Sequence, residues 1–343
     1  MKLGRIILAA VCTALFSYGA SAQTVVVKLA TVAPKDSTWY HYLVELKQSW
    51  AQASDGKVKL KIYAGTLGDE NDILRRMRIG QLNAATVSTA GLGQIDEAAN
   101  ALHIPLAFSS YAELEYVQTR IAESLEKALR KKGIVVLNWG DAGWVRFFTK
   151  SPVRTPDDLR KLKLFVWSAG ESTAAEELWK ELGFKPVPLS SVDILPALQT
   201  GMISAYQAPP LVALANQWFA FSGWMTNMRW APLTGATVIS TKTWSKIPAE
   251  LRPTLAQLAR EAGIRLRDQV RQLEANAIKA MTKRGLQVVE IPPDAMKQWE
   301  QLALSSYARI RGTLVSAKYF DRVLELRDEY RKMKVGAGKA SPG

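Results

Sequence analysis

Two aromatic residues, Phe165 and Trp167, stand at the end of a short apolar segment, residues 162–167, which runs into the small residues 168–170. A buried strand that enters a helix through such a turn delivers its last side chains to a crevice between elements in α/β proteins. Aromatic rings in a crevice supply stacking and apolar contact, which is the chemistry of binding. We therefore expect this strand end to line a ligand site.

Catalytic chemistry has no comparable signal. The two histidines, His41 and His103, belong to no metal-binding or nucleophile-activating pattern, and the chain has no G-x-S-x-G, Walker A or G-x-G-x-x-G motif. The acidic pairs at 157–158 and 176–177 are better explained as helix caps and solvated helix faces than as acid–base pairs. The sequence predicts a protein that is not an enzyme and that uses no metal and no cofactor.

The first 22 residues have the pattern of a signal peptide. Lys2 and Arg5 precede an apolar run at 6–16, and Ala20-Ser-Ala22 places small residues before Gln23. A membrane anchor is the alternative, but the run is too short to span a bilayer. The single cysteine lies at position 12, so the mature chain has no thiol for a disulfide or a metal site. We expect an exported, periplasmic protein.

The formal charge of +14 is high for a chain of this size, and removal of the signal peptide leaves 14 − 2 = +12. Such a charge is compatible with nucleic acid, an anionic membrane, anionic small ligands or a merely solvated basic surface. Lysine and arginine are scattered without a dense run, and export makes nucleic acid an improbable partner. We expect a monomer that binds a small organic ligand.

Strand and helix patterns alternate along the chain, which predicts an α/β fold with mostly parallel strands. The expected strands are 25–31, 58–62, 82–88, 134–139, 145–149, 162–167, 186–189, 203–207, 237–240 and 286–291. The clearest expected helices are 39–54, 111–131, 172–182 and 248–284, followed by two within 293–332. Gly263 is a candidate for a bend in the long helix, and residues 336–343 are expected to be a disordered tail.

An ordered set of short motifs identifies a family resemblance. The motifs are Leu67-Gly-Asp-Glu70, Pro156-Asp-Asp-Leu159, Leu162-Lys-Leu164, Ala197-Leu-Gln-Thr-Gly201 and Ile247-Pro-Ala-Glu-Leu-Arg252. In order and spacing they resemble the extracytoplasmic solute receptors of TRAP transporters, the DctP type. The resemblance implies a two-lobed periplasmic binding protein fold with a cleft between the lobes and a long helix shared by both.

The same resemblance implies a mode of action and a division of the chain. Ligand is captured in the cleft by hinge closure and delivered to TRAP membrane permease subunits. A ligand sensor of the same fold that signals to a membrane kinase is the alternative function. Lobe I is expected to comprise residues 23–145 plus 234–273, and lobe II residues 146–233 plus 274–335.

This chain departs from the family pattern at the cleft. Phe165 stands where relatives keep the arginine that binds the ligand's carboxylate, and Trp167 replaces a proline. Ala208 replaces an asparagine, and Ser88 occupies another position that is polar in some relatives. Arg146 lies close to the family's second cleft arginine. Because polar contacts are lost together, we expect a ligand more aromatic or apolar than a C4-dicarboxylate.

Two ligand classes fit these departures best: an aromatic acid held by Arg146, or a neutral hydrophobic compound stacked between aromatic rings. A cation over the aromatic set is a third class, but the basic net charge argues against it. Eight of the eleven tryptophans lie between positions 139 and 244, and most must pack in the core. The further candidate walls of the site are Trp39, Trp144, Tyr206 and Trp230.

Overall fold

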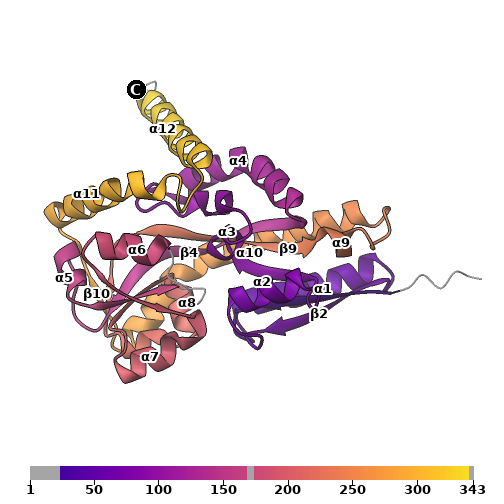
Figure 1. The fold of residues 1–343 in the computed structure, drawn as a ribbon, viewed down its shortest axis with the longest axis horizontal. Coiled ribbons are helices and arrows are strands. Elements are labelled where there is room, and N and C mark those ends of the chain that lie inside the picture. Colours follow the sequence, from indigo (N-terminus) through magenta and orange to yellow (C-terminus); the bar gives the residue numbers. More distant parts are fainter. Residues whose placement is uncertain (1–23, 168–173, 340–343) are drawn as a thin grey trace, which may run out of the picture.

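A single sheet runs through both lobes of this α/β protein (Figure 1). The computed structural model describes residues 24–167 and 174–339, so the expected signal peptide lies outside the described residues. Among these residues the sheet has ten strands, in the order β2-β1-β3-β9-β4-β7-β5-β6, with β8 pairing β4 and β10. The strands are β1 (Val25–Thr31), β2 (Val58–Ala64), β3 (Ala84–Ser88), β4 (Ile134–Thr149), β5 (Lys163–Trp167), β6 (Lys185–Leu189), β7 (Ala205–Ala208), β8 (Trp224–Thr226), β9 (Ala231–Ser240) and β10 (Gln287–Val289).

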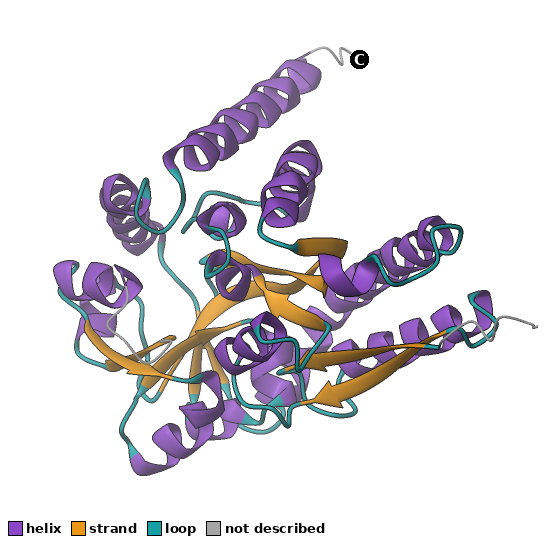
Figure 2. Cartoon of the chain, turned by 45° about the vertical axis from the view of Figure 1, so that its right-hand side comes forward, coloured by secondary structure: helices purple, strands orange, loops and turns teal. Residues whose placement is uncertain are grey.

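Helices cover the sheet (Figure 2), and no described helix is long and apolar enough to cross a membrane. The α-helices are α1 (Thr38–Ala53), α2 (Glu70–Arg78), α3 (Thr89–Gly93), α4 (Tyr111–Lys131), α5 (Pro156–Arg160), α6 (Ala174–Glu181), α7 (Ile194–Thr200), α8 (Pro210–Ala215), α9 (Thr241–Trp244), α10 (Arg252–Thr282), α11 (Pro293–Ile310) and α12 (Ala317–Lys339). Short 3-10 helices are η1 (Glu97–Leu102), η2 (Ser191–Asp193) and η3 (Trp218–Phe221). Residues 336–339 are thus helical, which corrects the expected tail, and 340–343 lie outside the described residues.

Within each lobe the core strands are parallel. In lobe I, β1 pairs in parallel with β2 and β3, and in lobe II, β5 pairs in parallel with β6 and β7. Parallel neighbours end at the same edge of a sheet, so the loops that follow β2 and β3, and those that follow β5, β6 and β7, gather at one edge of their lobe. These two edges meet between the lobes.

The lobes are joined by β4, a strand of 16 residues. Ile134 to Val145 pairs antiparallel with β9, and Arg146 to Thr149 pairs antiparallel with β7. The sequence predicted two separate strands here, which is wrong. The pairing with β9 instead continues through the glycines in the middle and through two register shifts, at Val136/Asn138 and Asp141/Gly143. Such bulges bend and twist a strand without ending it.

The long helix α10 packs against α1 in lobe I, against β4, and against α8 in lobe II, as the family resemblance implied. Its helical assignment continues through Gly263, the position where the sequence suggested a bend. The glycine allows close packing. A Cβ at position 263 would lie 2.7 Å from the Cβ of Asn138, whose amide donates to the Ala259 carbonyl of the same helix at 3.0 Å.

Gly263→Ala is expected to lower the free energy of unfolding by about 1–3 kcal/mol, because the added methyl overpacks the α10–β4 contact. Urea denaturation measures this change. Ile264→Ala on the exposed side of the same helix is the control and should change stability by no more than about 0.5 kcal/mol. Equal effects of the two substitutions would contradict the close-packing explanation.

Candidate functional site

The two lobes are in contact through the carboxylate of Asp69. Asp69 follows β2 in lobe I and caps α2. From lobe II it accepts hydrogen bonds from Trp167 Nε1 at 2.7 Å, Ser190 Oγ at 2.8 Å, and the backbone N–H and Oγ of Ser191, both at 2.9 Å. We call Asp69, Trp167, Ser190 and Ser191 the interlobe cluster. Hydrogen bonds to a charged acceptor are stronger than neutral ones, so this cluster stabilises the contact between the lobes.

Glu70 holds the neighbouring part of lobe I together. Its carboxylate accepts from the Ser88 backbone N–H at 2.7 Å and from Ser88 Oγ at 2.6 Å. Ser88 Oγ in turn accepts from the Gly91 N–H and caps α3. Burial raises the pKa of Glu70 from 4.5 to about 7, and the hydrogen bonds from Ser88 oppose that shift. Ser88 is therefore committed to Glu70 and to its helix.

Four of the residues expected from the sequence lie in one hydrophobic cluster of lobe II. Phe165 is 5% exposed, Tyr206 is fully buried and Ala208 is 4% exposed, and Trp167 packs against them. The Tyr206 ring stacks on Phe148 with centroids 5.1 Å apart. Trp167 and Ala208 are the last residues of their strands, so this cluster reaches the edge where the interlobe cluster lies.

Arg146 lies on β4 beside Ala208 but is held by other groups. Its guanidinium donates to Asn227 Oδ1 at 2.7 Å and pairs with Glu274 of α10 at 3.4 Å. Glu274 also accepts from the Tyr111 hydroxyl at 2.8 Å. Burial, and then the charge of Glu274, raise the pKa of Tyr111, so this hydroxyl remains a donor. The charge of Arg146 is thus balanced by a protein carboxylate.

The remaining candidates lie in separate parts of the core. Trp144 is fully buried beside Tyr111, with ring centroids 5.3 Å apart. Trp230 packs in the cluster of Phe147 and Trp299, and Trp39 packs against the core between α1 and α10. The structure does not bring these three tryptophans together with Phe165 in one cluster.

Sequence reasoning missed the hydrogen bonds of Asp69, which was considered only as part of a family motif. Its partners in lobe II are 98 to 122 residues away along the chain. It also missed Glu274 as the partner of Arg146, 128 residues distant. The only available signals were the position of Asp69 after a strand and the position of Glu274 on the shared helix.

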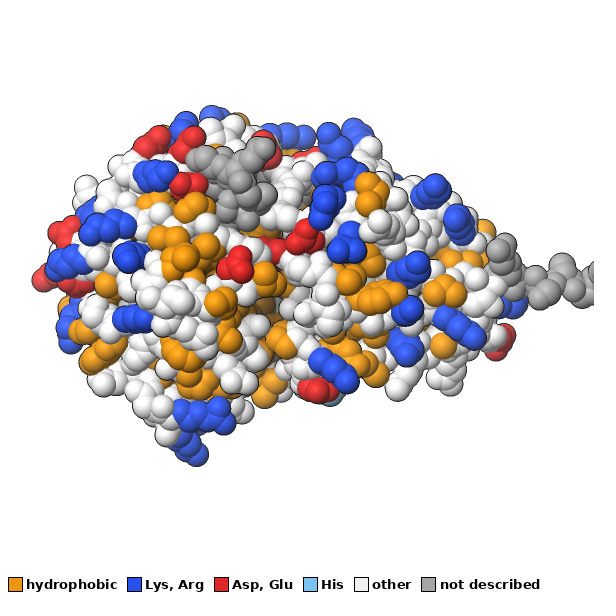
Figure 3. Space-filling model, turned by 60° about the horizontal axis from the view of Figure 1, so that its bottom comes forward, with side chains coloured by type: hydrophobic (Ala, Val, Ile, Leu, Met, Phe, Trp, Pro, Cys, Tyr) orange, Lys and Arg blue, Asp and Glu red, His pale blue; other side chains and the backbone are white. Residues whose placement is uncertain are grey.

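The surface is hollowed between the two lobes, and hydrophobic side chains gather around this hollow (Figure 3). Within 24–167 and 174–339 no group of three or more His, Cys, Asp or Glu side chains is placed to hold a metal ion. His103 Nδ1 lies 2.9 Å from the Pro232 carbonyl, and burial lowers the pKa of His103. The two lobes therefore meet at a surface that is partly aromatic.

Comparison with known families decides the identity. The model of the bacterial extracellular solute-binding protein family 7, DctP, matches residues 29–312. The chain belongs to this family. Its members are periplasmic binding proteins and not enzymes, which confirms the prediction of a binding protein without catalytic activity.

Two curated relatives of this DctP-family protein are 22% and 26% identical to it over most of its length. The 2,3-diketo-L-gulonate-binding periplasmic protein YiaO of Escherichia coli is 26% identical over 244 residues, which cover 69% of this chain and 73% of YiaO. The C4-dicarboxylate-binding periplasmic protein DctP of Rhodobacter capsulatus is 22% identical over 304 residues, which cover 88% of this chain and 90% of that protein.

Solved structures share the fold. The sugar acid binding protein DctPAm of Advenella mimigardefordensis, in complex with galactonate, aligns with a TM-score of 0.83 and 17% identity, covering 90% of this chain and 99% of that one. A TRAP periplasmic solute-binding protein of Ralstonia eutropha, with bound (S)-2-acetolactate, aligns with a TM-score of 0.82 and 21% identity, covering 89% and 99%. These matches confirm the two-lobed α/β fold predicted from the sequence.

Trp167→Phe is expected to shift the lobes toward an open arrangement, because it removes the indole N–H that donates to Asp69. A hydrogen bond to a charged acceptor contributes about 1.5 kcal/mol or more, so the ratio of open to closed molecules should rise roughly tenfold. Residues 23–343 contain no cysteine, so in this part of the chain Ile79→Cys in lobe I and Met202→Cys in lobe II, both exposed, provide the only two sites for spin labels. Pulsed dipolar spectroscopy should then show a larger share of long distances.

Trp218→Phe is the matched control, since Trp218 packs within lobe II against Tyr206. It should leave the distance distribution unchanged. Identical distributions for Trp167→Phe and the parent protein would show that the indole donor does not stabilise the contact between the lobes.

Glu70→Gln tests the raised pKa. The folded protein holds a proton on Glu70 up to about pH 7, whereas the unfolded chain releases it near pH 4.5, so ionisation destabilises the fold as pH rises between these values. Glutamine does not ionise. The Tm of Glu70→Gln minus that of the parent protein should therefore increase from pH 5 to pH 7.5. A difference that stays constant with pH would contradict a buried, protonated Glu70.

Proposed function

We propose that this protein is a periplasmic receptor that captures a small organic ligand between its lobes by hinge closure and delivers it to a TRAP-type membrane permease. The observation that carries the proposal is the interlobe cluster, where donors of lobe II converge on Asp69 of lobe I at the carboxyl ends of the strands. Ligands of open α/β sheets bind at this edge. A ligand that touches both lobes favours the closed state by its differential affinity.

We further propose that the ligand is an aromatic acid or a hydrophobic compound, more apolar than a C4-dicarboxylate. The related proteins named above bind sugar acids, C4-dicarboxylates or acetolactate according to their names. Here Phe165 and Trp167 present aromatic surface at the edge, and Asp69 places a negative charge there. A second carboxylate on the ligand would be repelled by Asp69 at this end.

The contacts of Arg146 favour a ligand with a single carboxylate. Its guanidinium already pairs with Glu274, but its Nε has no acceptor among the described residues. A buried arginine whose charge is already balanced keeps one unused donor, which can donate a hydrogen bond to one oxygen of a ligand. Ser88 and Tyr206 remain proposed neighbours of the ligand, whereas Trp39, Trp144 and Trp230 pack in other clusters.

The proposed receptor is exported by cleavage after residue 22 and acts as a monomer. Its lobes correspond to residues 23–145 plus 234–273 and 146–233 plus 274–335. Loss of ligand uptake when the permease is deleted would support transport. Intact uptake, with a transcriptional response that requires the receptor, would support the alternative of a sensor coupled to a membrane kinase.

A thermal-shift screen of the mature protein tests the ligand class, because a compound that binds only the folded state raises the Tm. We expect phenyl-substituted monocarboxylates to raise the Tm and succinate and malate to leave it unchanged. Stabilisation by succinate or malate, without stabilisation by aromatic acids, would refute the proposed class while leaving the receptor function in place.

Phe165→Arg tests the position itself. The substitution restores the charge that relatives carry there, so we expect it to weaken aromatic ligands about tenfold or more through lost apolar contact and to confer succinate binding. Phe221→Arg adds the same charge at an exposed site of lobe II and is the control. Ligand binding that is identical in both variants and the parent protein, by calorimetry, would place Phe165 outside the site.

A further inference from the structure

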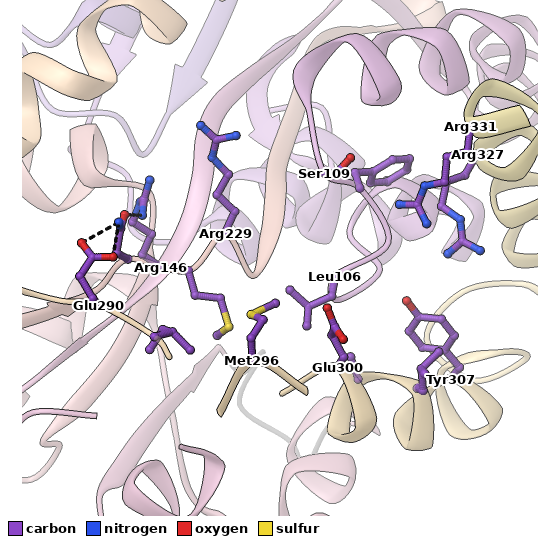
Figure 4. A pocket seen from close by; sticks show the side chains of 16 residues that line it. Leu106, Ser109, Arg146, Arg229, Glu290, Met296, Glu300, Tyr307, Arg327 and Arg331 are labelled. Carbon is purple, nitrogen blue, oxygen red and sulfur yellow. Dashed lines mark hydrogen bonds between the residues drawn. The ribbon is translucent and has the colours of Figure 1, made fainter. Parts of the chain in front are cut away.

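A second concavity lies away from the interlobe cluster, with a volume of about 740 Å³. It is enclosed by the loop before α4, the turn between β8 and β9, the segment between β10 and α11, and the helices α11 and α12 (Figure 4). Neither Asp69 nor Phe165, Trp167, Ala208 or Ser190 lines it. Of the sequence-predicted site residues only Arg146 does. We call it the α11–α12 pocket.

Apolar side chains form one part of the pocket wall. They are Leu106, Phe108, Met228, Ile291, Met296, Ala303 and Leu304. In Figure 4, Leu106 and Met296 lie in the middle of the view, between Arg146 and Glu290 on one side and Arg327, Arg331 and Tyr307 on the other. Methionine side chains are flexible and polarisable, so this wall can adapt to ligands of different shape.

Four arginines also line the pocket, and they differ in how their charges are used. Arg146 is paired with Glu274, and Arg331 with the buried carboxylate of Glu113 at 2.6 Å. Arg327 pairs with its chain neighbour Asp328 at 2.7 Å. These three contribute to the positive surroundings but are already neutralised by protein carboxylates.

Arg229 is the exception. Its guanidinium lies 5.5 Å from the centre of the Trp144 ring, a cation–π contact, and no carboxylate of the described residues forms an ion pair with it. The Arg229 side chain is exposed, so N–H donors that do not face the indole ring remain available to an anion. A planar guanidinium binds a carboxylate through two parallel hydrogen bonds.

Acidic groups limit the charge that a ligand can carry. Glu290 accepts two hydrogen bonds from the Asn227 amide, at 2.9 and 3.0 Å, and so faces the same end of the pocket as Arg146. Glu300 also lines the pocket and forms no ion pair within the described residues. These carboxylates would repel a second negative charge on the ligand.

We propose that the α11–α12 pocket is a second ligand site, for an amphipathic organic monocarboxylate whose carboxylate is bound by Arg229 and whose apolar chain lies along Leu106, Met228 and Met296. The pocket takes Leu106, Phe108 and Ser109 from lobe I and its other residues from lobe II, next to Arg146 and its partner on α10. Apart from Arg146, an occupant contacts residues that the cleft ligand does not.

Straight-chain monocarboxylates from butanoate to decanoate are the probes, titrated into the mature protein by calorimetry. We expect affinity to rise roughly fourfold for each CH₂ that becomes buried. Octanoate should bind more tightly than octanedioate, its dicarboxylate counterpart, and octylamine should not bind. Preferential binding of octylamine, or affinity independent of chain length, would overturn the proposal.

Variants assign the site. Arg229→Gln should weaken octanoate about tenfold or more, and Met296→Glu, which places a carboxylate on the apolar wall, should abolish binding. Arg284→Gln, an exposed arginine outside the pocket, removes the same charge and should change nothing. Octanoate binding that survives both pocket variants but is lost in Trp167→Ala would place the fatty acid between the lobes and refute a second site.

Discussion

The continuity of β4 is the constraint on which the rest of the molecule depends. One strand pairs with β9 in lobe I and with β7 in lobe II, so its backbone hydrogen bonds belong to both lobes. Any movement of the lobes must be absorbed within this strand and its partner. The two bulges on the lobe I side of the crossing supply the local twist that a regular ladder would resist.

The long helix α10 reinforces the same constraint. It packs on β4 at Gly263 and Asn138, and it brings Glu274 to Arg146 just where β4 passes from one lobe to the other. A buried pair of this kind is costly to break on one side, because the remaining charge is left without a partner. The helix and the strand are therefore held together at the crossing, whereas the contact at Asp69 is made by other elements of the two lobes.

Most of the fold could be predicted from the sequence, because local signals agree with the tertiary structure. Helix α4 spans Tyr111–Lys131, the range expected from the sequence. The strand β4 could not be predicted as one element, since Gly140 and Gly143 resemble a turn until the pairing with β9 is known. The family resemblance correctly indicated the two lobes and the binding function, because it depends on the order of several motifs.

The candidate site was less accessible to sequence reasoning. Phe165 and Trp167 could be grouped because they end one strand, and the family resemblance added Ala208. The hydrogen bonds to Asp69 and the pairing of Arg146 with Glu274 depend on residues far apart in the chain, and no local pattern encodes them. Whether a polar group is available to a ligand or already used by the protein is therefore a property of the tertiary structure.

The hydrogen bonds between Asp69 and lobe II have a consequence for affinity. When part of the closed state's stability comes from contacts between the lobes themselves, only the open fraction of molecules can admit a ligand. The apparent dissociation constant is then larger than the intrinsic one by the inverse of that fraction. Selection can therefore tune the affinity of this receptor by changing Ser190 or Ser191 of the interlobe cluster, without altering an atom that touches the solute.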